Sequence, residues 1–311
     1  MHAYSWLHSP FERVLLSKYG GKMRSLLQIL KLPVVLQDVY RIKTVLYPWD
    51  RRPADSILFR GFYRSELTAI RGLVRPSDTV FDVGSNIGLH TVWMDRLVGP
   101  QGKVYAFEPV PETFRILIKT IRLNHCQSAI PHSLALSDMS GTTTIHVFEP
   151  QYSEFNTMGL PAMPGLDGEK VHPKGVVEVE ATTLDTFCLE HGIHRINFMK
   201  VDVEGFEKQV FMGGRRLLGE RRIDCLSFEI SQDPLKGLGI CPREVFEVLE
   251  DHGYRSYRFD EMSGRFDGPV HDSTDYYQVY FASYRDLLSP EDRNTTPFSS
   301  ETSEIGLGHN R

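Results

Sequence analysis

Between about residue 60 and residue 285, apolar and polar positions alternate between two patterns of spacing. Short β-rich runs are followed by stretches of helical periodicity, which is typical of a parallel sheet flanked by helices. The predicted strands are Thr79–Val83, Lys103–Phe107, Ile130–Leu136, Ile196–Val203, Asp224–Ile230, Tyr254–Phe259 and Tyr276–Ser283. The pattern therefore predicts an α/β fold with a seven-stranded, doubly wound, mostly parallel sheet. The two late runs are expected to close it as a hairpin-like pair, with an antiparallel last strand.

Helical patterns fill the intervals between these runs. One helix is expected to start at about Gly88, directly after the first strand. A second covers Pro111–Asn124, where proline occupies a favoured early position. Two more are expected over Gly205–Leu218 and Pro242–His252.

An insertion interrupts the alternation of predicted strands and helices between the third and fourth strands. Thr142–Phe148 and Val176–Ala181 alternate as an antiparallel pair would, and they flank a glycine- and proline-rich loop at residues 151–175. A loop of this length in a compact domain is usually a lid, a binding loop or disordered. We expect a substrate lid, with a disordered insertion as the alternative.

The two ends of the chain differ from this central domain. Residues 1–58 carry amphipathic helical patterns and are expected to form a helical N-terminal cap, packed on the main domain or free to bind a partner. Residues 59–288 form the catalytic domain in this reading. Residues 289–311 are rich in Ser, Thr, Asn and charge, and disorder is expected there.

The composition argues against several classes of protein. The net charge of −5 and the pI near 6.2 lack the basic surplus of a nucleic-acid binder, so no nucleic-acid partner is expected. The four cysteines are widely spaced and form no metal-binding motif. No apolar stretch is long enough for a signal peptide or a membrane span. We expect a soluble, cytoplasmic protein with reduced thiols.

The strongest chemical signal is Asp82-Val-Gly84-Ser85-Asn86-Ile-Gly88, which lies between the first strand and its helix. Glycines there permit a tight turn and a close approach of a ligand to the backbone. The start of the following helix presents N–H groups to an anionic group. Asp82 suits either an ammonium group of the ligand or a cap on the turn.

Glu108 ends the second strand, where Rossmann-type folds place an acid on ribose hydroxyls. These features fit NAD or S-adenosylmethionine. The turn lacks the G-x-G-x-x-G pattern that accommodates a pyrophosphate and contains no basic residue. The sequence therefore favours a ligand with a methionine carboxylate and ammonium group.

Six motifs follow one another along the chain: Asp82–Gly88, Phe107-Glu-Pro-Val-Pro, Asn124, Ala135-Leu-Ser-Asp138 with Gly141, Thr183-Leu-Asp185 and Lys200-Val-Asp-Val-Glu-Gly-Phe-Glu207. In these motifs and their order the chain resembles the FkbM family of S-adenosylmethionine-dependent methyltransferases. The likeness covers about residues 75–235. It implies a Rossmann-like class I methyltransferase fold, cofactor binding by the turn and Glu108, adenine flanked by Ser137 and Asp138, and methylation of hydroxyls on sugars or secondary metabolites. Asp138 alone reads as a turn residue.

Lys200, Asp202 and Glu204 alternate along the fourth strand, so their side chains should share one face. The acids lie at its carboxyl end, where open α/β sheets bind ligands, and Glu229 occupies the corresponding end of the next strand. An acceptor hydroxyl must lose a proton as its oxygen attacks the sulfonium methyl in line. We predict Asp202 as base or orienting group, supported by Glu204 and Glu229.

Three alternatives stay open. The acids could cap the next helix and pair with Lys200 or Lys208. They could instead hold magnesium or calcium, although no metal ligand is assigned because no fixed motif is present. At the level of function, an NAD(P)-dependent oxidoreductase and a non-catalytic cofactor-binding protein compete with the methyltransferase. The oxidoreductase is disfavoured because no Tyr-x-x-x-Lys pattern lies in a suitable helix.

Overall fold

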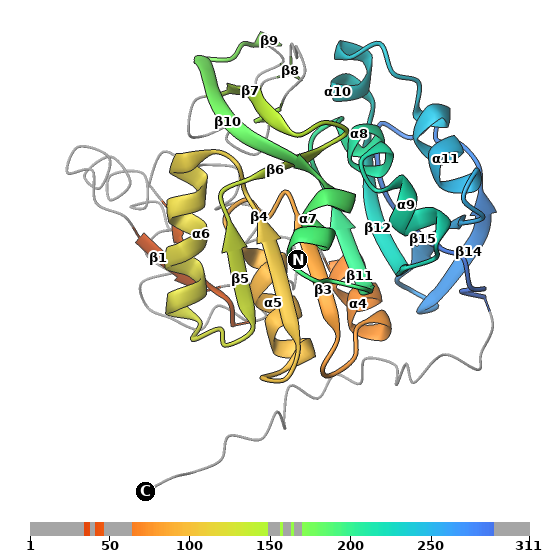
Figure 1. Cartoon of the computed structure of the whole chain (residues 1–311), viewed down its shortest axis with the longest axis horizontal. Helices are drawn as coiled ribbons and strands as arrows, with labels where there is room; N and C mark the ends of the chain where they lie inside the picture. Colours follow the sequence, from red (N-terminus) through yellow and green to blue (C-terminus); the bar gives the residue numbers. More distant parts are fainter. Residues whose placement is uncertain are drawn as a thin grey trace, which may run out of the picture.

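A computed structural model describes residues 34–37, 41–46, 64–148, 156–157, 163–164 and 170–288 (Figure 1). Its centre is an eight-stranded sheet. In spatial order the strands are β5 (Ala129–His132), β4 (Lys103–Phe107), β3 (Thr79–Val83), β11 (Ile196–Val201), β12 (Ile223–Ser231), β15 (Tyr277–Ser283), β13 (Arg255–Asp260) and β14 (Arg265–Val270).

The strand order makes this a doubly wound sheet. The chain runs outward from β3 through β4 to β5 and then crosses back to β11 and β12, and all these neighbours are parallel. Strand β15 runs antiparallel to both β12 and β13. The switch point between β3 and β11 is where such sheets bind ligands. The predicted Rossmann-like, class I methyltransferase topology is confirmed, including its antiparallel last strand.

Two strand predictions need correction. The sheet has an eighth strand, β14, whose Gly268 and Pro269 argue against a strand, although proline is tolerated at the sheet edge that β14 occupies. The predicted strand Ile130–Leu136 is two strands, because β5 ends at His132 and β6 (Ala135–Ser137) joins a different sheet.

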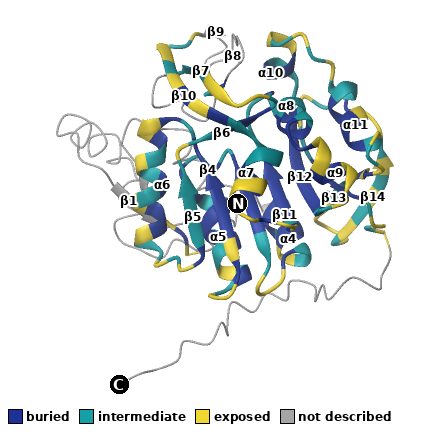
Figure 2. Ribbon diagram, in the orientation of Figure 1, coloured by how far each residue is buried: buried dark blue, intermediate teal, exposed yellow. Residues whose placement is uncertain are grey.

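Helices cover both faces of the sheet. One face carries α4 (Arg64–Leu73), α5 (Leu89–Val98) and α6 (Pro111–Leu123). The other carries α7 (Leu184–Glu190), α8 (Glu207–Met212), α9 (Arg215–Gly219) and α11 (Pro242–Glu250). A short helix, α10 (Gln232–Gly237), follows β12. Figure 2 shows the central strands buried between the two helical layers.

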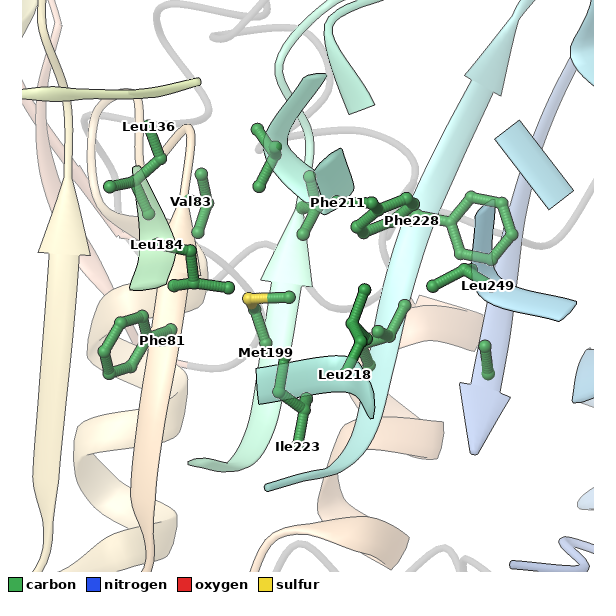
Figure 3. Close-up of a cluster of buried hydrophobic side chains, with 14 of the residues drawn as sticks. Phe81, Val83, Leu136, Leu184, Met199, Phe211, Leu218, Ile223, Phe228 and Leu249 are labelled. Carbon is green, nitrogen blue, oxygen red and sulfur yellow. The ribbon is translucent and has the colours of Figure 1, made fainter. Parts of the chain in front are cut away.

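The larger apolar core lies on the second of these faces. Figure 3 shows Phe81, Met199 and Phe228, from three adjacent strands, packed near Leu184 and Leu218 of the covering helices. Each such side chain contributes about 1.5–3 kcal/mol when fully buried. Because strand side chains alternate between faces, this packing directs Asp82 and Lys200 to the opposite face.

The helix predicted over Gly205–Leu218 is interrupted. It forms α8 and α9, which are separated at Gly213 and Gly214. A Cβ atom on Gly213 would lie 2.0 Å from the carbonyl oxygen of Ser137, so the chain needs glycine there to pack against β6. Two adjacent glycines also weaken a helix.

A three-stranded sheet lies above the carboxyl ends of the central strands (Figure 1). Strands β7 (Gly141–Val147) and β10 (Gly175–Thr183) form the predicted antiparallel pair, and β6 joins β10 in parallel. Within the loop they flank, β8 (Met163–Pro164) pairs with β9 (Lys170–Val171). Most of the predicted lid at residues 151–175 lies outside the described residues.

The described pieces of the predicted N-terminal cap are strands rather than helix. β1 (Val34–Gln37) pairs with β2 (Lys43–Leu46), in keeping with the β-branched residues of this segment. Asn124, directly after α6, anchors β2: its Oδ1 accepts the N–H of Lys43 at 2.9 Å, and its Nδ2 donates to the Lys43 carbonyl at 2.7 Å. The rest of residues 1–58 and the predicted disordered tail at 289–311 lie outside the described residues.

Among the residues that the structure describes, none of the helices has the length and apolar character needed to cross a bilayer.

Candidate functional site

The glycine turn after β3 is packed too tightly for any side chain at its first position. Gly84 has a φ of +78°, and a Cβ atom on it would lie 1.8 Å from the carbonyl oxygen of Asp202. The N–H groups of Gly84 and Ser85 donate to the carbonyl of Phe107 at 3.1 and 2.9 Å. The turn therefore holds the ends of β3, β4 and β11 together at the switch point.

The rest of the turn leads into α5. The Ser85 hydroxyl donates to the carbonyl of Asp82 at 2.7 Å, while Asn86 and Gly88 have left-handed φ values of 47° and 93°. The side-chain oxygen of Asn86 is buried and has no hydrogen-bond partner among the described residues. A buried oxygen of this kind is costly unless a ligand or water donates to it.

Glu108 lies against this turn, as its predicted role requires. One carboxylate oxygen accepts the N–H of Asn86 at 3.0 Å, and the other accepts the N–H of Val110 at 2.9 Å. The residue is 6% exposed. Burial raises the pKa of Glu108 to about 7, despite the two backbone N–H groups that favour its charged form.

Asp82 is fully buried below the turn. One carboxylate oxygen accepts the hydroxyl of Thr91 at 2.5 Å and so ties the turn to the first turn of α5. The other oxygen has no partner among the described residues. Among the described residues no backbone N–H of the turn donates to the Asp82 side chain, so Asp82 does not cap the turn, and one oxygen remains for a ligand group or water.

A buried polar row crosses the face of the sheet below the site. Asp82, Lys200 and Ser227 are register partners on β3, β11 and β12. The Lys200 ammonium is 2.8 Å from a carboxylate oxygen of Asp202, which confirms that these two side chains share a face. Burial alone would lower the pKa of Lys200, but Asp202, Asp82 and Glu66 outweigh it and hold this pKa above its usual range. Lys200 therefore stays charged and is unsuited to act as a base.

Glu66 of α4 completes this row, and it was not predicted from the sequence because it belongs to no motif. Its carboxylate lies 3.0 Å from Nε2 of His90 and accepts the hydroxyl of Ser227 at 3.3 Å. Burial opposes ionisation, but His90 and Lys200 hold the pKa of Glu66 below its usual range. His90, near the start of α5, thus has its Nε2 directed at this buried carboxylate.

Three acids meet at the carboxyl ends of β11 and β12, where Asp202 and Glu204 follow β11 and Glu229 lies within β12, two residues before its end. One carboxylate oxygen from each of Asp202, Glu204 and Glu229 lies within 4.8 Å of the other two. Glu204 has a left-handed φ of 51°, which turns the chain sharply after the strand. Glu229 is 8% exposed, and burial together with the neighbouring carboxylates of Asp202, Glu204 and Glu207 raises its pKa well above the usual range.

A fourth acid, Glu207, was not predicted as part of the site. One of its oxygens accepts the N–H groups of Val203 and Gly205 at 3.1 and 3.3 Å, so Glu207 shapes the loop that carries Glu204. Burial raises the pKa of Glu207 to about 7. Among the described residues no side chain caps the start of α8, so the helix-capping role considered for the predicted acids is not observed. Asp202 pairs with Lys200, as considered, whereas Lys208 pairs with Glu244.

Ser137 and Asp138 lie at the end of β6, in the smaller sheet. The Ser137 hydroxyl donates to Asp138 at 3.1 Å, and the Ser137 carbonyl packs against Gly213. Their contacts among the described residues do not include Glu108 or the turn, so the predicted adenine contact stays a prediction.

Thr157, inside the predicted lid, is buried and hydrogen-bonds to the loop after β11 that carries Glu204. Its hydroxyl donates to the carbonyl of Glu204 at 2.7 Å, and its backbone pairs with His146 of β7. This residue was not singled out from the sequence, because a lone threonine in a long loop carries no pattern.

Comparison with known families gives one clear match. A profile described as "Methyltransferase FkbM domain" matches residues 82–256, which run from the turn through the acids to β13.

Three curated proteins illustrate the similarity. Methyltransferase sdnD of Sordaria araneosa is 31% identical over 196 residues, which cover 56% of this chain and 73% of that protein. Hexuronic acid methyltransferase AglP of Haloferax volcanii is 29% identical over 60% of this chain and 69% of its own length. The 31-O-demethyl-FK506 methyltransferase FkbM of Streptomyces tacrolimicus is 31% identical, and the match covers 45% of this chain and 60% of that protein.

Proposed function

The chain belongs to the FkbM methyltransferase family, and on that premise we propose that it transfers a methyl group from S-adenosylmethionine to a hydroxyl oxygen. The acceptor is a sugar, a glycan or a secondary metabolite. The names of two relatives support this class, since AglP is described as acting on hexuronic acid and FkbM as acting on 31-O-demethyl-FK506.

The residues around the turn fit such a cofactor. Asp82 and Asn86 each keep a buried oxygen without a partner among the described residues, and these oxygens can accept from an amino-acid ammonium or from water. Glu108 directly follows β4, at a position where a carboxylate can accept both ribose hydroxyls. Gly84 lets β3 and β11 approach closely at the turn, because the Asp202 carbonyl fills the space that a side chain would need.

One observation supports methyl transfer at this site: the acidic end of β11 lies directly against the glycine turn after β3. The space that a Gly84 side chain would need is filled by the Asp202 carbonyl, so the two elements are in contact. When bound, S-adenosylmethionine supplies a methyl group activated by a sulfonium. The protein must then hold an acceptor oxygen beside the turn and remove its proton.

Asp202 suits that task better than its neighbours. Its side chain is 26% exposed, so an acceptor can reach it, and the Lys200 ammonium at 2.8 Å holds it in place. The buried Glu229 has a raised pKa and therefore holds its proton more tightly. We assign Asp202 as the base or orienting group for the acceptor hydroxyl, with Glu204 and Glu229 completing the acidic surface.

A labelled-methyl assay tests the proposal. The full chain is incubated with S-adenosylmethionine carrying a deuterated methyl group and with hexuronic acids, their glycosides and polyhydroxylated macrolides. We expect the label on a hydroxyl oxygen, identified as an O-methyl resonance, and no transfer to the same acceptor already methylated at that oxygen. Transfer to a nitrogen or carbon atom instead would contradict the proposal.

A further inference from the structure

The chain turns sharply after β11, in the loop that carries Glu204. The carbonyl of Val203 accepts the N–H of Phe206 at 3.4 Å, and the two residues between them, Glu204 and Gly205, have left-handed φ values of 51° and 97°. This is the pattern of a type I′ turn, whose central positions favour asparagine, aspartate and glycine. Gly205 suits its position, whereas Glu204 adopts a backbone conformation that is unfavourable for glutamate.

The unfavourable backbone conformation lies at a residue of the candidate site. An oxygen of the Glu204 carboxylate lies within 4.8 Å of oxygens of Asp202 and Glu229. Residues in such conformations persist only where the surrounding contacts fix them, and they are frequent at functional sites. The contacts that fix this turn therefore also fix the direction of the Glu204 carboxylate.

The peptide group between Glu204 and Gly205 is held at both ends. Its N–H, which belongs to Gly205, donates to a carboxylate oxygen of Glu207 at 3.3 Å. Its carbonyl, which belongs to Glu204, accepts the hydroxyl of Thr157 at 2.7 Å. Glu207 is close along the chain, but Thr157 lies 47 positions away, in the insertion between β7 and β10. The insertion thus contacts the turn that carries Glu204 through the Thr157 hydroxyl.

Thr157 is itself held in place, so its hydroxyl has a defined position. The residue is 2% exposed. Its carbonyl accepts the N–H of His146 at 2.8 Å, and its own N–H donates to the His146 carbonyl at 3.2 Å, as in a short antiparallel pair with β7. The side chain of the preceding residue, Asn156, accepts the N–H of Phe148 at 3.0 Å. Because this segment is already ordered, the bond to the turn costs little further conformational entropy.

We propose that Thr157 is a positioning residue for the acceptor site: its hydroxyl fixes the peptide between Glu204 and Gly205 and so directs the Glu204 carboxylate toward the acceptor. Without the hydroxyl, the Glu204 carbonyl loses this donor, and the peptide can rotate toward a more favourable backbone conformation. The glycine turn after β3 should not respond, because it contacts the backbone carbonyl of Asp202, which precedes this loop. The effect on the acceptor rests on the proposed function, whereas the hold on the turn does not.

Amide hydrogen exchange tests the hold on the turn without any turnover. Exchange in the full chain is followed by mass spectrometry of peptides that cover residues 202–206. Thr157→Val removes the hydroxyl but keeps the shape of the side chain, and exchange of the N–H groups in the turn should become about tenfold faster. Thr157→Ser keeps the hydroxyl and should exchange as the wild type does. Thr144→Val makes the same replacement at an exposed position on β7 and should leave the turn unchanged.

Methyl transfer by the same samples tests the effect on the acceptor. In Thr157→Val we expect kcat/KM for the acceptor to fall by about tenfold, because a misdirected carboxylate no longer holds the acceptor in the reactive geometry. The affinity for S-adenosylhomocysteine should stay at the wild-type value. Thr157→Ser should restore the wild-type kcat/KM, which a loss of packing alone does not predict.

Unchanged exchange in Thr157→Val would overturn the inference, and so would faster exchange with a wild-type kcat/KM for the acceptor. Thermal unfolding shows whether each variant is folded, and Thr157→Ala decides if Thr157→Val is not. Failure of both variants to fold would assign the hydroxyl to the stability of the whole domain and would also overturn the inference. If the wild type transfers no methyl group to a hydroxyl but Thr157→Val exchanges faster, the proposed function is refuted and the hold on the turn is supported.

Discussion

Replacing Asp202 by asparagine is expected to lower the turnover number by about 10²- to 10⁴-fold, the usual contribution of a positioned acid or base. The amide keeps the shape of the side chain but cannot accept the acceptor's proton. Cofactor affinity should change little, because the contact between the glycine turn and residue 202 involves the backbone carbonyl.

The assay for this variant is single-turnover transfer of a labelled methyl group to the acceptor identified above. Asp251→Asn, at an exposed position after α11, is the matched control and should retain the wild-type rate. A variant with wild-type turnover would remove Asp202 from the mechanism.

Gly84→Ala is expected to destabilise the protein by about 3 kcal/mol or more, through overpacking and a backbone conformation unfavourable to alanine. The new methyl group would lie 1.8 Å from the Asp202 carbonyl oxygen, and φ at this position is +78°. Because both atoms in the clash belong to or adjoin the backbone, β3 and β11 must separate to relieve it.

Gly99→Ala provides the control for this change. Gly99 also has a left-handed φ, +63°, but a Cβ atom there meets nothing within 4 Å. Its cost should be limited to the backbone conformation, on the order of 1–3 kcal/mol, and should stay below that of Gly84→Ala. Urea unfolding of both variants measures the difference, and equal free energies of unfolding would show that the contact between the turn and Asp202 is looser than the structure indicates.

The parts of the fold that depend on local patterns of apolar and polar residues could be predicted from the sequence. The strands β3, β4, β11 and β12 are short apolar runs, and the antiparallel pair β7 and β10 shows regular alternation. Strand β14 was missed because its glycine and proline oppose a strand, and only its place at the edge of the sheet permits one. The cap was predicted as helix, but its described part pairs as β1 and β2.

The residues of the site also divide into those that local sequence patterns predict and those that only the fold brings together. The turn and Glu108 could be predicted because their spacing along one strand–turn–helix unit fixes their proximity. Glu66 could not, since it reaches Ser227 across 161 positions of sequence and belongs to a helix without a motif. Lys200 was visible in the sequence, but its ion pairs with the buried acids follow from the register of three strands.

Glu108 also gives cofactor binding a pH dependence with a definite sign. Burial raises the pKa of Glu108 to about 7, so the carboxyl is largely protonated below that pH. Ribose hydroxyls donate to the charged form, and binding must therefore release a proton at low pH. The affinity for S-adenosylhomocysteine should fall by about tenfold per pH unit below this pKa and level off above it.

Calorimetric titration with S-adenosylhomocysteine, beside NADH, tests the central claim most directly. The account predicts that the wild-type chain binds S-adenosylhomocysteine and not NADH, and that Glu108→Ala weakens binding by about 100-fold through the loss of two charged hydrogen bonds. Glu112→Ala, at an exposed position in the next helix, should bind as the wild type does. Binding of NADH without S-adenosylhomocysteine, or full affinity in Glu108→Ala, would contradict the account.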